Sequence, residues 1–320
     1  MSEEEILEFE VPFEQAGKRL DQVLAGLAGD YSRSRLQSWI KSGRVTVDGE
    51  VLAPRAKLAG GERLRVNAEA DPADDTIGPE PVPLDILYED EHILVINKPA
   101  GLVMHPAAGN RTGTVQNGLL HYDAALAAVP RAGIVHRLDK DTTGLFVVAK
   151  TLQAHKSLVE QLQQRSVSRE YLAIVNGTLV SGATVDAPIG RHPNDRKRMA
   201  VRENGKEAIT HYRLAEKYRA HTLITVRLET GRTHQIRVHL SHSGHPLLGD
   251  LTYGGKPRFP RGCDESLREA IRSFRRQALH AFRLSLVHPA SAETMSWEAP
   301  VPQDMQAMCA WLAEDVKTHG

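Results

Sequence analysis

A run of prolines and acidic residues between Asp71 and Pro83 places the strongest constraint on how this chain can fold. Such a run buries little apolar surface, so it favours a linker over a packed element. It divides a chain of 320 residues, which is longer than one hydrophobic core usually fills. We therefore expect an acidic segment at 1–16, a small domain at 17–70, a linker at 71–85 and a larger domain at 86–320.

The small domain carries the patterns of two short helices and a small sheet. Apolar residues keep helical spacing from Leu20 to Leu27 and again from Leu36 to Ile40, and Gly43 follows the second segment. Alternating residues before and after Asp48-Gly49, which is a hairpin turn signal, predict strands. The expected order is helix, helix, hairpin, strand.

The small domain also concentrates positive charge, although the formal net charge of the chain is +0. Acidic residues crowd the N-terminal segment and the linker, and they mask the basic segment between them. A basic surface of this kind can hold the phosphates of folded RNA, and a solvated charged face is the plainer alternative. The candidate RNA-binding residues are Arg19, Arg33, Arg35, Lys41 and Arg44.

The larger domain is predicted to belong to the α+β class. Strands dominate its pattern and helices interrupt them, which favours a mainly antiparallel sheet over regularly alternating parallel units. The predicted strands lie at 93–96, 145–148, 171–175, 223–228 and 284–287, and the predicted helices at 115–120 and 152–164.

The sequence also limits where the protein can reside. No segment approaches the roughly 20 apolar residues that span a bilayer, and the start is acidic where a signal peptide is basic and then apolar. Cys263 and Cys309 lie far apart, so neither a disulfide framework nor a paired-cysteine metal site is expected. We expect a cytoplasmic protein without membrane association.

One polar stretch between Gly133 and Lys150 carries the most concentrated candidate chemistry. It places two carboxylates, two cations and an imidazole within six positions, just before an apolar strand. At least one carboxylate should face a cation rather than water, which keeps it ionised and oriented. These residues are His136, Arg137, Asp139, Lys140 and Asp141.

Within this stretch, H-R-L-D-K-D-T-T-G-L resembles the signature of the large-subunit-ribosomal class of pseudouridine synthases. The resemblance covers nearly the whole chain after Ile86, with Thr143 and Phe146 as small departures. Before it, 17–67 resembles the RNA-binding domain named after ribosomal small-subunit protein S-four, through R-L-D-Q-V-L and G-E-R-L-R-V. The other matching segments are N-K-P-A-G-L-V-M-H-P, S-R-E-Y-L-A, G-R-T-H-Q-I-R-V-H-L, G-H-P-L-L-G-D-L-T-Y-G and L-H-A.

This resemblance implies a set of catalytic residues. The catalytic carboxylate of the family falls on Asp139, and the aromatic ring that stacks on the target base falls on Tyr171, whose alternative is a core tyrosine on a strand edge. Arg237 is implied as the cation that pairs with Asp139. Arg232 competes with it if alternation along a strand decides which side chains face the cleft.

The resemblance also implies substrate-binding residues. Arg137 would occupy the gap left by an extruded base, or would contact phosphate or Asp139 instead. His136 either joins this set or only supports the turn. The third motif adds Thr233 and His234.

The implied reaction is the isomerisation of uridine to pseudouridine in large-subunit rRNA, in the stem-loop called helix 69. It involves no net redox change, so no cofactor, nucleotide or metal is expected. Asp139 could attack C1′ of the ribose or assist departure of the base, and the sequence leaves both routes open. The expected partner is large-subunit rRNA or a pre-ribosomal large subunit, with a monomeric protein and a role in ribosome assembly.

Two alternatives compete with this interpretation. Histidines at 234, 239, 242 and 245 suggest zinc, but on a strand His234 and His239 would face opposite sides. The other alternative is a non-catalytic RNA-binding factor of ribosome assembly, in which the larger domain is only a platform.

Overall fold

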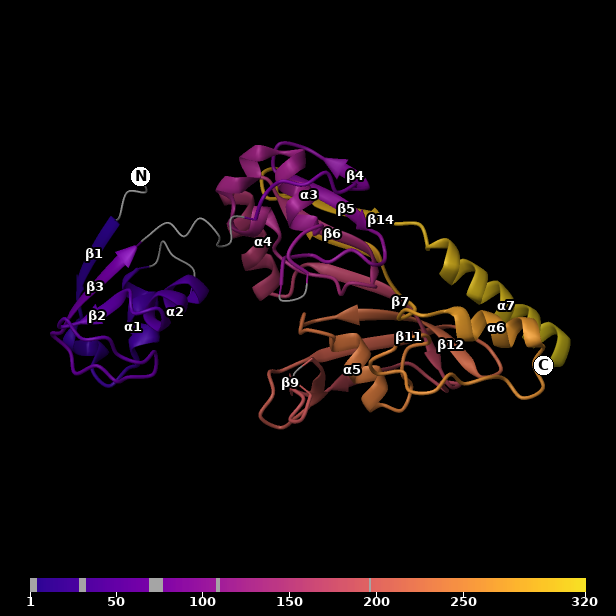
Figure 1. The fold of residues 1–320 in the computed structure, drawn as a ribbon. Helices are drawn as coiled ribbons and strands as arrows, with labels where there is room; N and C mark the ends of the chain where they lie inside the picture. Colours follow the sequence, from indigo (N-terminus) through magenta and orange to yellow (C-terminus); the bar gives the residue numbers. More distant parts are fainter. Residues whose placement is uncertain (1–4, 29–32, 69–76, 108–109, 196) are drawn as a thin grey trace. The chain divides into compact units, whose positions relative to one another are not determined.

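The computed structural model describes residues 5–28, 33–68, 77–107, 110–195 and 197–320 (Figure 1). Within these ranges, the side chains of Glu5, Arg33, Ser34, Arg35 and Ala68 lie outside the description. The chain forms two compact units, Met1–Thr76 and Ile77–Gly320.

The N-terminal unit packs two helices against a three-stranded antiparallel sheet. The helices α1 (Leu20–Leu27) and α2 (Arg33–Lys41) precede β2 (Val45–Val47) and β3 (Arg63–Ala68), in the order predicted from the sequence. Apolar residues of both helices meet inward-facing strand residues in a single core. That core includes Leu20, Leu24, Leu36, Val45 and Leu64.

A further strand, β1 (Glu5–Glu10), shifts the boundary that the sequence analysis gave to this unit. It pairs with β3 along its whole length and forms an edge of the sheet. Leu7 and Phe9 pack against the core, and the short 3-10 helix η1 (Phe13–Gln15) follows. The predicted boundary at 17 leaves this strand outside its unit, because the crowding of glutamates near the N-terminus indicates a solvated acidic segment, although Leu7 and Phe9 face the core.

The C-terminal unit is built on a nine-stranded sheet of the predicted α+β, mainly antiparallel type. Every pairing in it is antiparallel except that of β6 with β13. The strand order is β4 (Ile86–Glu89), β5 (Ile93–Lys98), β6 (Thr143–Ala149), β13 (Leu279–Val287), β7 (Ser168–Asn176), β12 (His221–Leu228), β11 (Ile209–Lys217) and β8 (Ala183–Asp186), with β14 (Thr294–Glu298) on β13. A separate two-stranded sheet joins β9 (Ile189–Arg191) and β10 (Met199–Val201).

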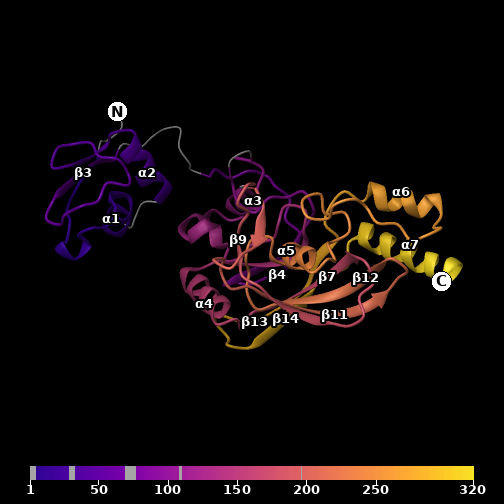
Figure 2. The ribbon, with the colours of Figure 1, turned by 90° about the horizontal axis from the view of Figure 1, so that it is seen from below.

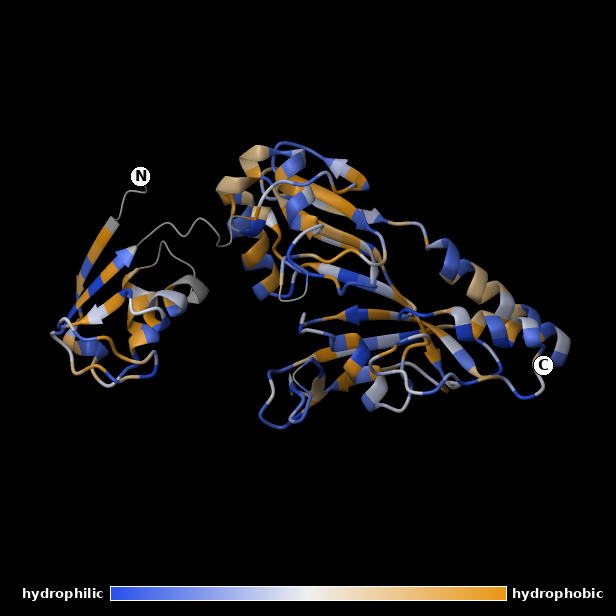
Figure 3. Ribbon diagram, in the orientation of Figure 1, coloured by the Kyte–Doolittle hydropathy of each residue, from blue (hydrophilic) through white to orange (hydrophobic). Residues whose placement is uncertain are grey.

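Both faces of this sheet are covered by helices. Leu94 and Ile96 of β5 share a core with α3 (Val115–Tyr122), while Ile93 and Val95 share another with α4 (Leu152–Gln163). The continuous apolar run of β5 follows from this burial on two sides. Figure 3 shows hydrophobic residues concentrated on the central strands.

Three more helices complete the unit. α6 (Glu265–Ser273) and α7 (Gln303–His319) lie side by side and share a core with Ile174 of β7 (Figures 1 and 2). α5 (Gln235–His242) follows β12 and buries most of its length. Two 3-10 helices, η2 (Ala124–Ala128) and η3 (Pro130–Gly133), connect α3 to the polar stretch before β6.

The start of β6 is fixed by a close approach of two strands. Gly144 has a φ of 110°, and a Cβ at this position would lie only 2.2 Å from the carbonyl oxygen of Ala281 in β13. Only glycine tolerates both conditions. The segment that precedes β6 is therefore held against β13 without freedom to shift.

The described part of the predicted linker is packed rather than extended into solvent. Residues 69–76 lie outside the described ranges, but Asn117 Nδ2 donates to the carbonyl of Gly78 at 2.8 Å. The Glu80 carboxylate accepts from the backbone of Gly113 at 2.8 Å, and Leu84 packs against the core. Residues 78–84 therefore contact α3 and the turn before it, and the second compact unit begins at Ile77.

The helices offer no candidate for a membrane span. None of those in the described ranges combines the length and the apolar composition that crossing a bilayer requires.

Candidate active site

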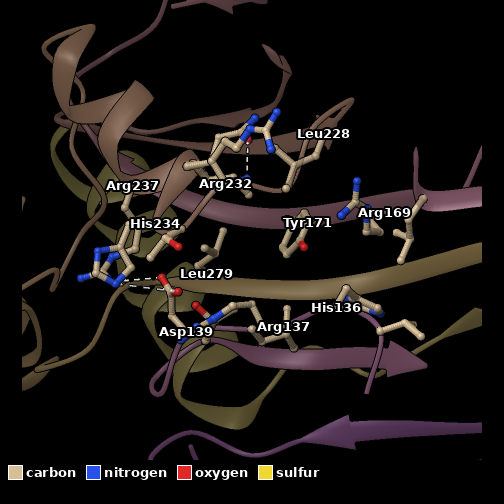
Figure 4. A pocket seen from close by; sticks show the side chains of 18 of the residues that line it. His136, Arg137, Asp139, Arg169, Tyr171, Leu228, Arg232, His234, Arg237 and Leu279 are labelled. Atoms are coloured by element: carbon tan, nitrogen blue, oxygen red, sulfur yellow. Dashed lines mark hydrogen bonds and ion pairs between the residues drawn. The ribbon is translucent and has the colours of Figure 1, made fainter. Parts of the chain in front are cut away.

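A cavity of about 560 Å³ opens in the C-terminal unit, where the segment before β6, strand β7 and the turn into α5 meet (Figure 4). This volume lies in the usual range for a small-molecule site. All eight candidate residues that the sequence analysis placed in the C-terminal unit line it: His136, Arg137, Asp139, Tyr171, Arg232, Thr233, His234 and Arg237.

Asp139 is held in this cavity by the fold of its own loop. Thr142 N donates to the Asp139 carbonyl at 3.1 Å and closes a turn just before β6. Buried Lys98 donates to the carbonyls of Lys140, Leu102 and Pro99 at 2.7 to 2.9 Å, which uses all three of its N–H groups. Burial lowers the pKa of Lys98 to about 7, against the opposing effect of the nearby carboxylates of Asp141 and Asp139.

The Asp139 carboxylate is oriented by a guanidinium. Arg237 Nη1 donates to Asp139 Oδ2 at 3.0 Å, while Nε and Nη2 hold Asp250 at 2.7 and 3.0 Å. Burial opposes the charge on Arg237, but its hydrogen bonds and its attraction to Asp250 and then Asp139 outweigh burial and raise its pKa. Burial likewise opposes the charge on Asp250, yet bonds from Arg237 and two backbone N–H groups lower its pKa. Both carboxylates therefore face a permanently charged partner.

The element that supplies Arg237 differs from the expected strand. Residues 235–242 form α5, and His234 precedes this helix with a left-handed φ of 57°. The argument from strand alternation is therefore wrong, although Arg237 is the residue that reaches Asp139. Polar and apolar residues alternate here, but the Gln235 side chain accepts from Arg232 N at 2.9 Å and from Thr230 Oγ1 at 2.7 Å, which stabilises the first helical turn.

Arg232 and His234 occupy the rim and one wall of the cavity. Arg232 Nε donates to the carbonyl of Glu207 at 2.9 Å, so this guanidinium does not pair with Asp139. His234 Nδ1 contacts the Tyr253 hydroxyl at 2.8 Å, and its Nε2 lies 3.9 Å from Asp139 Oδ1. Burial lowers the pKa of His234, with Asp139 acting in the opposite direction.

Tyr171 projects from β7 into the cavity and is 5% exposed. Burial raises the pKa of its hydroxyl, with a smaller contribution from Asp139 and an opposing one from Arg169. The ring is therefore a neutral phenol at neutral pH. It can stack on a planar group and donate one hydrogen bond.

His136 and Arg137 behave differently although they are neighbours. Burial lowers the pKa of His136 to about 3, and its Nε2 accepts from Val147 N at 3.1 Å, so the neutral ring anchors the loop to β6. Arg137 is exposed at the cavity, and no acidic partner for it is found among the described residues. Its guanidinium is therefore available to a ligand in the cavity.

Two residues of the cavity region were missed by the sequence analysis. Asp250 lies in a quoted motif, but nothing in the sequence shows that it shares Arg237 with Asp139 across 111 positions. Arg169 stands two residues before Tyr171 and lines the same cavity. Its spacing of two residues from Tyr171, which puts both side chains on one face of a strand, is the signal that could have placed it.

The candidate RNA-binding residues of the N-terminal unit can be placed in part. Arg19 forms an ion pair with Asp21, and Lys41 is exposed at the end of α2. Arg44 is partly buried just before β2. The side chains of Arg33 and Arg35 lie outside the described residues.

The histidines of the zinc alternative point to separate partners. His239 contacts Thr210 Oγ1 and the carbonyl of Ala187, both at 2.9 Å, and His245 contacts the carbonyl of Asn176 at 3.1 Å. Within the part of the chain that the structure describes, no three His, Cys, Asp or Glu residues are grouped as a metal site.

Fold and cavity together define a class of enzyme: an α+β protein whose cleft combines an oriented carboxylate, an aromatic ring and several cations suited to a polyanionic substrate. Residues 92–242 match the RNA pseudouridylate synthase family, and residues 18–64 match the S4 domain. The chain belongs to the RNA pseudouridylate synthase family.

Similar proteins agree with this assignment. The ribosomal large subunit pseudouridine synthase D of Pseudomonas aeruginosa is 57% identical over 96% of this chain and 95% of its own length. The protein of the same name from Xanthomonas campestris is 56% identical over 95% of this chain and 92% of its own. The structure of human RNA pseudouridylate synthase domain containing 4 matches with a TM-score of 0.55 and 26% identity, over 72% of this chain and 93% of that one. The family resemblance seen in the sequence is thereby confirmed.

Proposed function

We propose that this chain converts specific uridines of large-subunit rRNA to pseudouridine, with Asp139 as the catalytic carboxylate. The observation that carries the proposal is the Asp139 carboxylate, oriented by Arg237 at 3.0 Å inside the cleft. The similar proteins named ribosomal large subunit pseudouridine synthase D support rRNA as the substrate.

The chemistry needs what the cleft supplies. The N1–C1′ bond of the nucleotide breaks, the uracil turns, and a C5–C1′ bond forms, after which C5 loses its proton and N1 gains one. A carboxylate oriented by Arg237 can attack C1′ or assist departure of the base, and both routes use the same placement. Tyr171 offers a planar face on which the base can stack while it is detached.

The target base must leave its stack before Asp139 can reach the ribose. Arg137 is the residue proposed to fill the vacated gap, because it is exposed, cationic and two positions before Asp139. Unstacking usually costs a few kcal/mol, which contacts of this kind can offset.

The N-terminal S4 domain is proposed to grip the rRNA around the target. Lys41 is exposed at the end of α2, where phosphate contacts would add affinity without taking part in the reaction. The helix 69 stem-loop, a pre-ribosomal particle in the cytoplasm and a role in ribosome assembly complete the proposal.

Exchange of Asp139 for asparagine tests the proposal. Asp139→Asn keeps the side-chain shape but removes the negative charge, so pseudouridine formation in an rRNA fragment should fall by at least about 10³-fold. Tritium release from C5-labelled uridine measures the rate, and filter binding measures RNA affinity, which should change little.

Asp141→Asn is the matched control, since Asp141 lies in the same loop but does not line the cavity. It should retain most of the activity. If Asp139→Asn still modified the RNA at the normal rate, the catalytic role would be refuted, and a non-catalytic RNA-binding factor would become the better account.

A further inference from the structure

Arg169 is a buried cation that has neither an acidic partner nor a full set of hydrogen bonds among the described residues. It is 8% exposed, almost the same as Arg237 at 7%, and its Nε is buried without a hydrogen-bond partner. Across the described residues no carboxylate pairs with it. Because an uncompensated buried charge is unfavourable, an acceptor supplied by a ligand is the simplest explanation for an arginine at this position.

The position of Arg169 shows which part of a ligand it would meet. Arg169 and Tyr171 alternate with half-buried residues on β7, so both point from the same face of the strand into the cavity. Figure 4 shows Tyr171 between Asp139 and Arg169. Two residues of a strand span about 6.6 Å, which is close to the width of a pyrimidine with its carbonyl groups.

Space for the guanidinium is provided by Gly231. A Cβ at this position would lie 2.8 Å from Arg169 Nη1. Any other residue would push the guanidinium from the wall where it now lies. The turn that carries Arg232 and His234 therefore also shapes the environment of Arg169.

We propose that Arg169 donates a hydrogen bond to O4 of the target uracil. The inference rests on the proposed function, which puts the ribose at Asp139 and the base on Tyr171. O4 is the ring substituent farthest from C1′, so it points to the end of the cavity where Arg169 lies.

This contact would serve both the reaction and its specificity. When the N1–C1′ bond breaks with its electron pair left on the base, negative charge spreads over N1, O2 and O4, and a fixed guanidinium stabilises it. Cytosine carries an amino group in place of O4. Two donors would then face each other in a buried site, which disfavours cytidine as a substrate.

A phosphate is the competing ligand for a guanidinium. Arg169 is almost fully buried beside Tyr171 and neutral His136, whereas a phosphate in an RNA chain is flanked by two sugars. A planar base reaches such a place more readily than the backbone does. Arg137, exposed at the same cavity, is better placed for phosphate.

The test combines Arg169→Met with replacement of the target uridine by 4-thiouridine, whose sulfur is a weaker acceptor. Single-turnover rates are measured for the four combinations in an rRNA fragment. Arg169→Met should slow the uridine reaction about 10²-fold, the usual effect of losing one such donor. In the variant, 4-thiouridine should then reduce the rate much less than it does in the wild-type protein.

Controls separate this inference from its rivals. 2-Thiouridine should slow the wild-type and Arg169→Met proteins by the same factor, and Arg169→Lys should recover part of the rate. If Arg169→Met and 4-thiouridine each slowed the reaction by an independent factor, and the two factors simply multiplied in the combination, the O4 contact would be refuted. A salt dependence of RNA binding that is shallower by about one unit in Arg169→Met would assign the residue to phosphate instead.

Stability distinguishes a ligand contact from a structural role. Removal of an unpaired buried charge should leave the melting temperature unchanged or raise it, so an unfolded or strongly destabilised Arg169→Met protein would overturn the inference. A wild-type protein that forms no pseudouridine would refute the proposed function and this inference together. A normally active Arg169→Met protein would refute this inference alone.

Discussion

The two ends of the cleft carry equally buried guanidiniums in opposite electrostatic settings. At one end, Arg237 donates to Asp139 and Asp250 through three of its nitrogens. At the other end, Arg169 has no carboxylate partner among the described residues and keeps an unsatisfied Nε. Burial alone therefore does not reveal what a charged residue does.

The difference separates a charge that the fold needs from a charge that the substrate needs. Arg237 neutralises two carboxylates, so its removal should harm the folded protein as well as the reaction. Arg169 neutralises nothing in the described protein, so its removal should harm only the reaction. Substitution of Arg237 should therefore lower both stability and reaction rate, whereas substitution of Arg169 should lower the reaction rate alone.

The largest effect is expected for Arg237→Met. This change leaves Asp139 and Asp250 without their cation, and breaking a buried pair in this way usually costs about 3–5 kcal/mol of the free energy of unfolding. Activity should also be lost, because Asp139 is no longer oriented. Urea unfolding at pH 7 measures the first effect and tritium release the second.

The stability lost in Arg237→Met should also depend on pH in a definite direction. In the wild-type protein the pKa of Asp250 is lowered on folding, so its stabilisation is present above its ordinary pKa and is lost as pH falls through the lowered value. Without Arg237, burial would raise that pKa instead. The stability difference between the two proteins should therefore be greatest near neutrality and shrink below about pH 4. A constant difference would show that packing, not charge, is lost.

Features that depend on residues close together in the sequence could be predicted, whereas features that depend on contacts between distant segments could not. Local motifs predicted the order of helices and strands in the small domain and the strands at 93–96 and 145–148, because apolar periodicity is a local property. The edge strand at 5–10 was missed, since only its pairing with β3 shows that Leu7 and Phe9 face a core.

The candidate site shows the same limit. Asp139 stood out because its neighbours in sequence are charged, and the family motifs pointed to Arg237. Asp250 and Arg169 become notable only when the chain folds, since one shares a guanidinium across the cleft and the other lacks a partner. Neither property leaves a trace in a single sequence.

An intermediate effect is expected for Gly231→Ala, which disturbs the unpaired end without touching Arg169 itself. The added Cβ would lie 2.8 Å from Arg169 Nη1, and the end of a flexible side chain can move aside. Stability should therefore change by less than about 1 kcal/mol, while pseudouridine formation should slow several-fold because the donor is displaced. Gly78→Ala, which meets no atom within 4 Å, is the control. If Gly231→Ala and Gly78→Ala formed pseudouridine at equal rates, the position of the Arg169 guanidinium would not matter for the reaction.

The smallest effect is expected for Arg165→Met, a third guanidinium that tests whether pairing or burial decides the outcome. Arg165 contacts Glu207 at 2.8 Å and Glu229 at 3.1 Å, so it is paired like Arg237, but its side chain and those of its partners are between 32% and 56% exposed. Water and salt screen such pairs, and each carboxylate left behind remains hydrated. The urea midpoint of Arg165→Met should therefore lie close to that of the wild-type protein, and any difference should vanish at high salt. If Arg165→Met lost as much stability as Arg237→Met, the number of carboxylate partners, and not their burial, would determine how strongly the fold depends on a guanidinium.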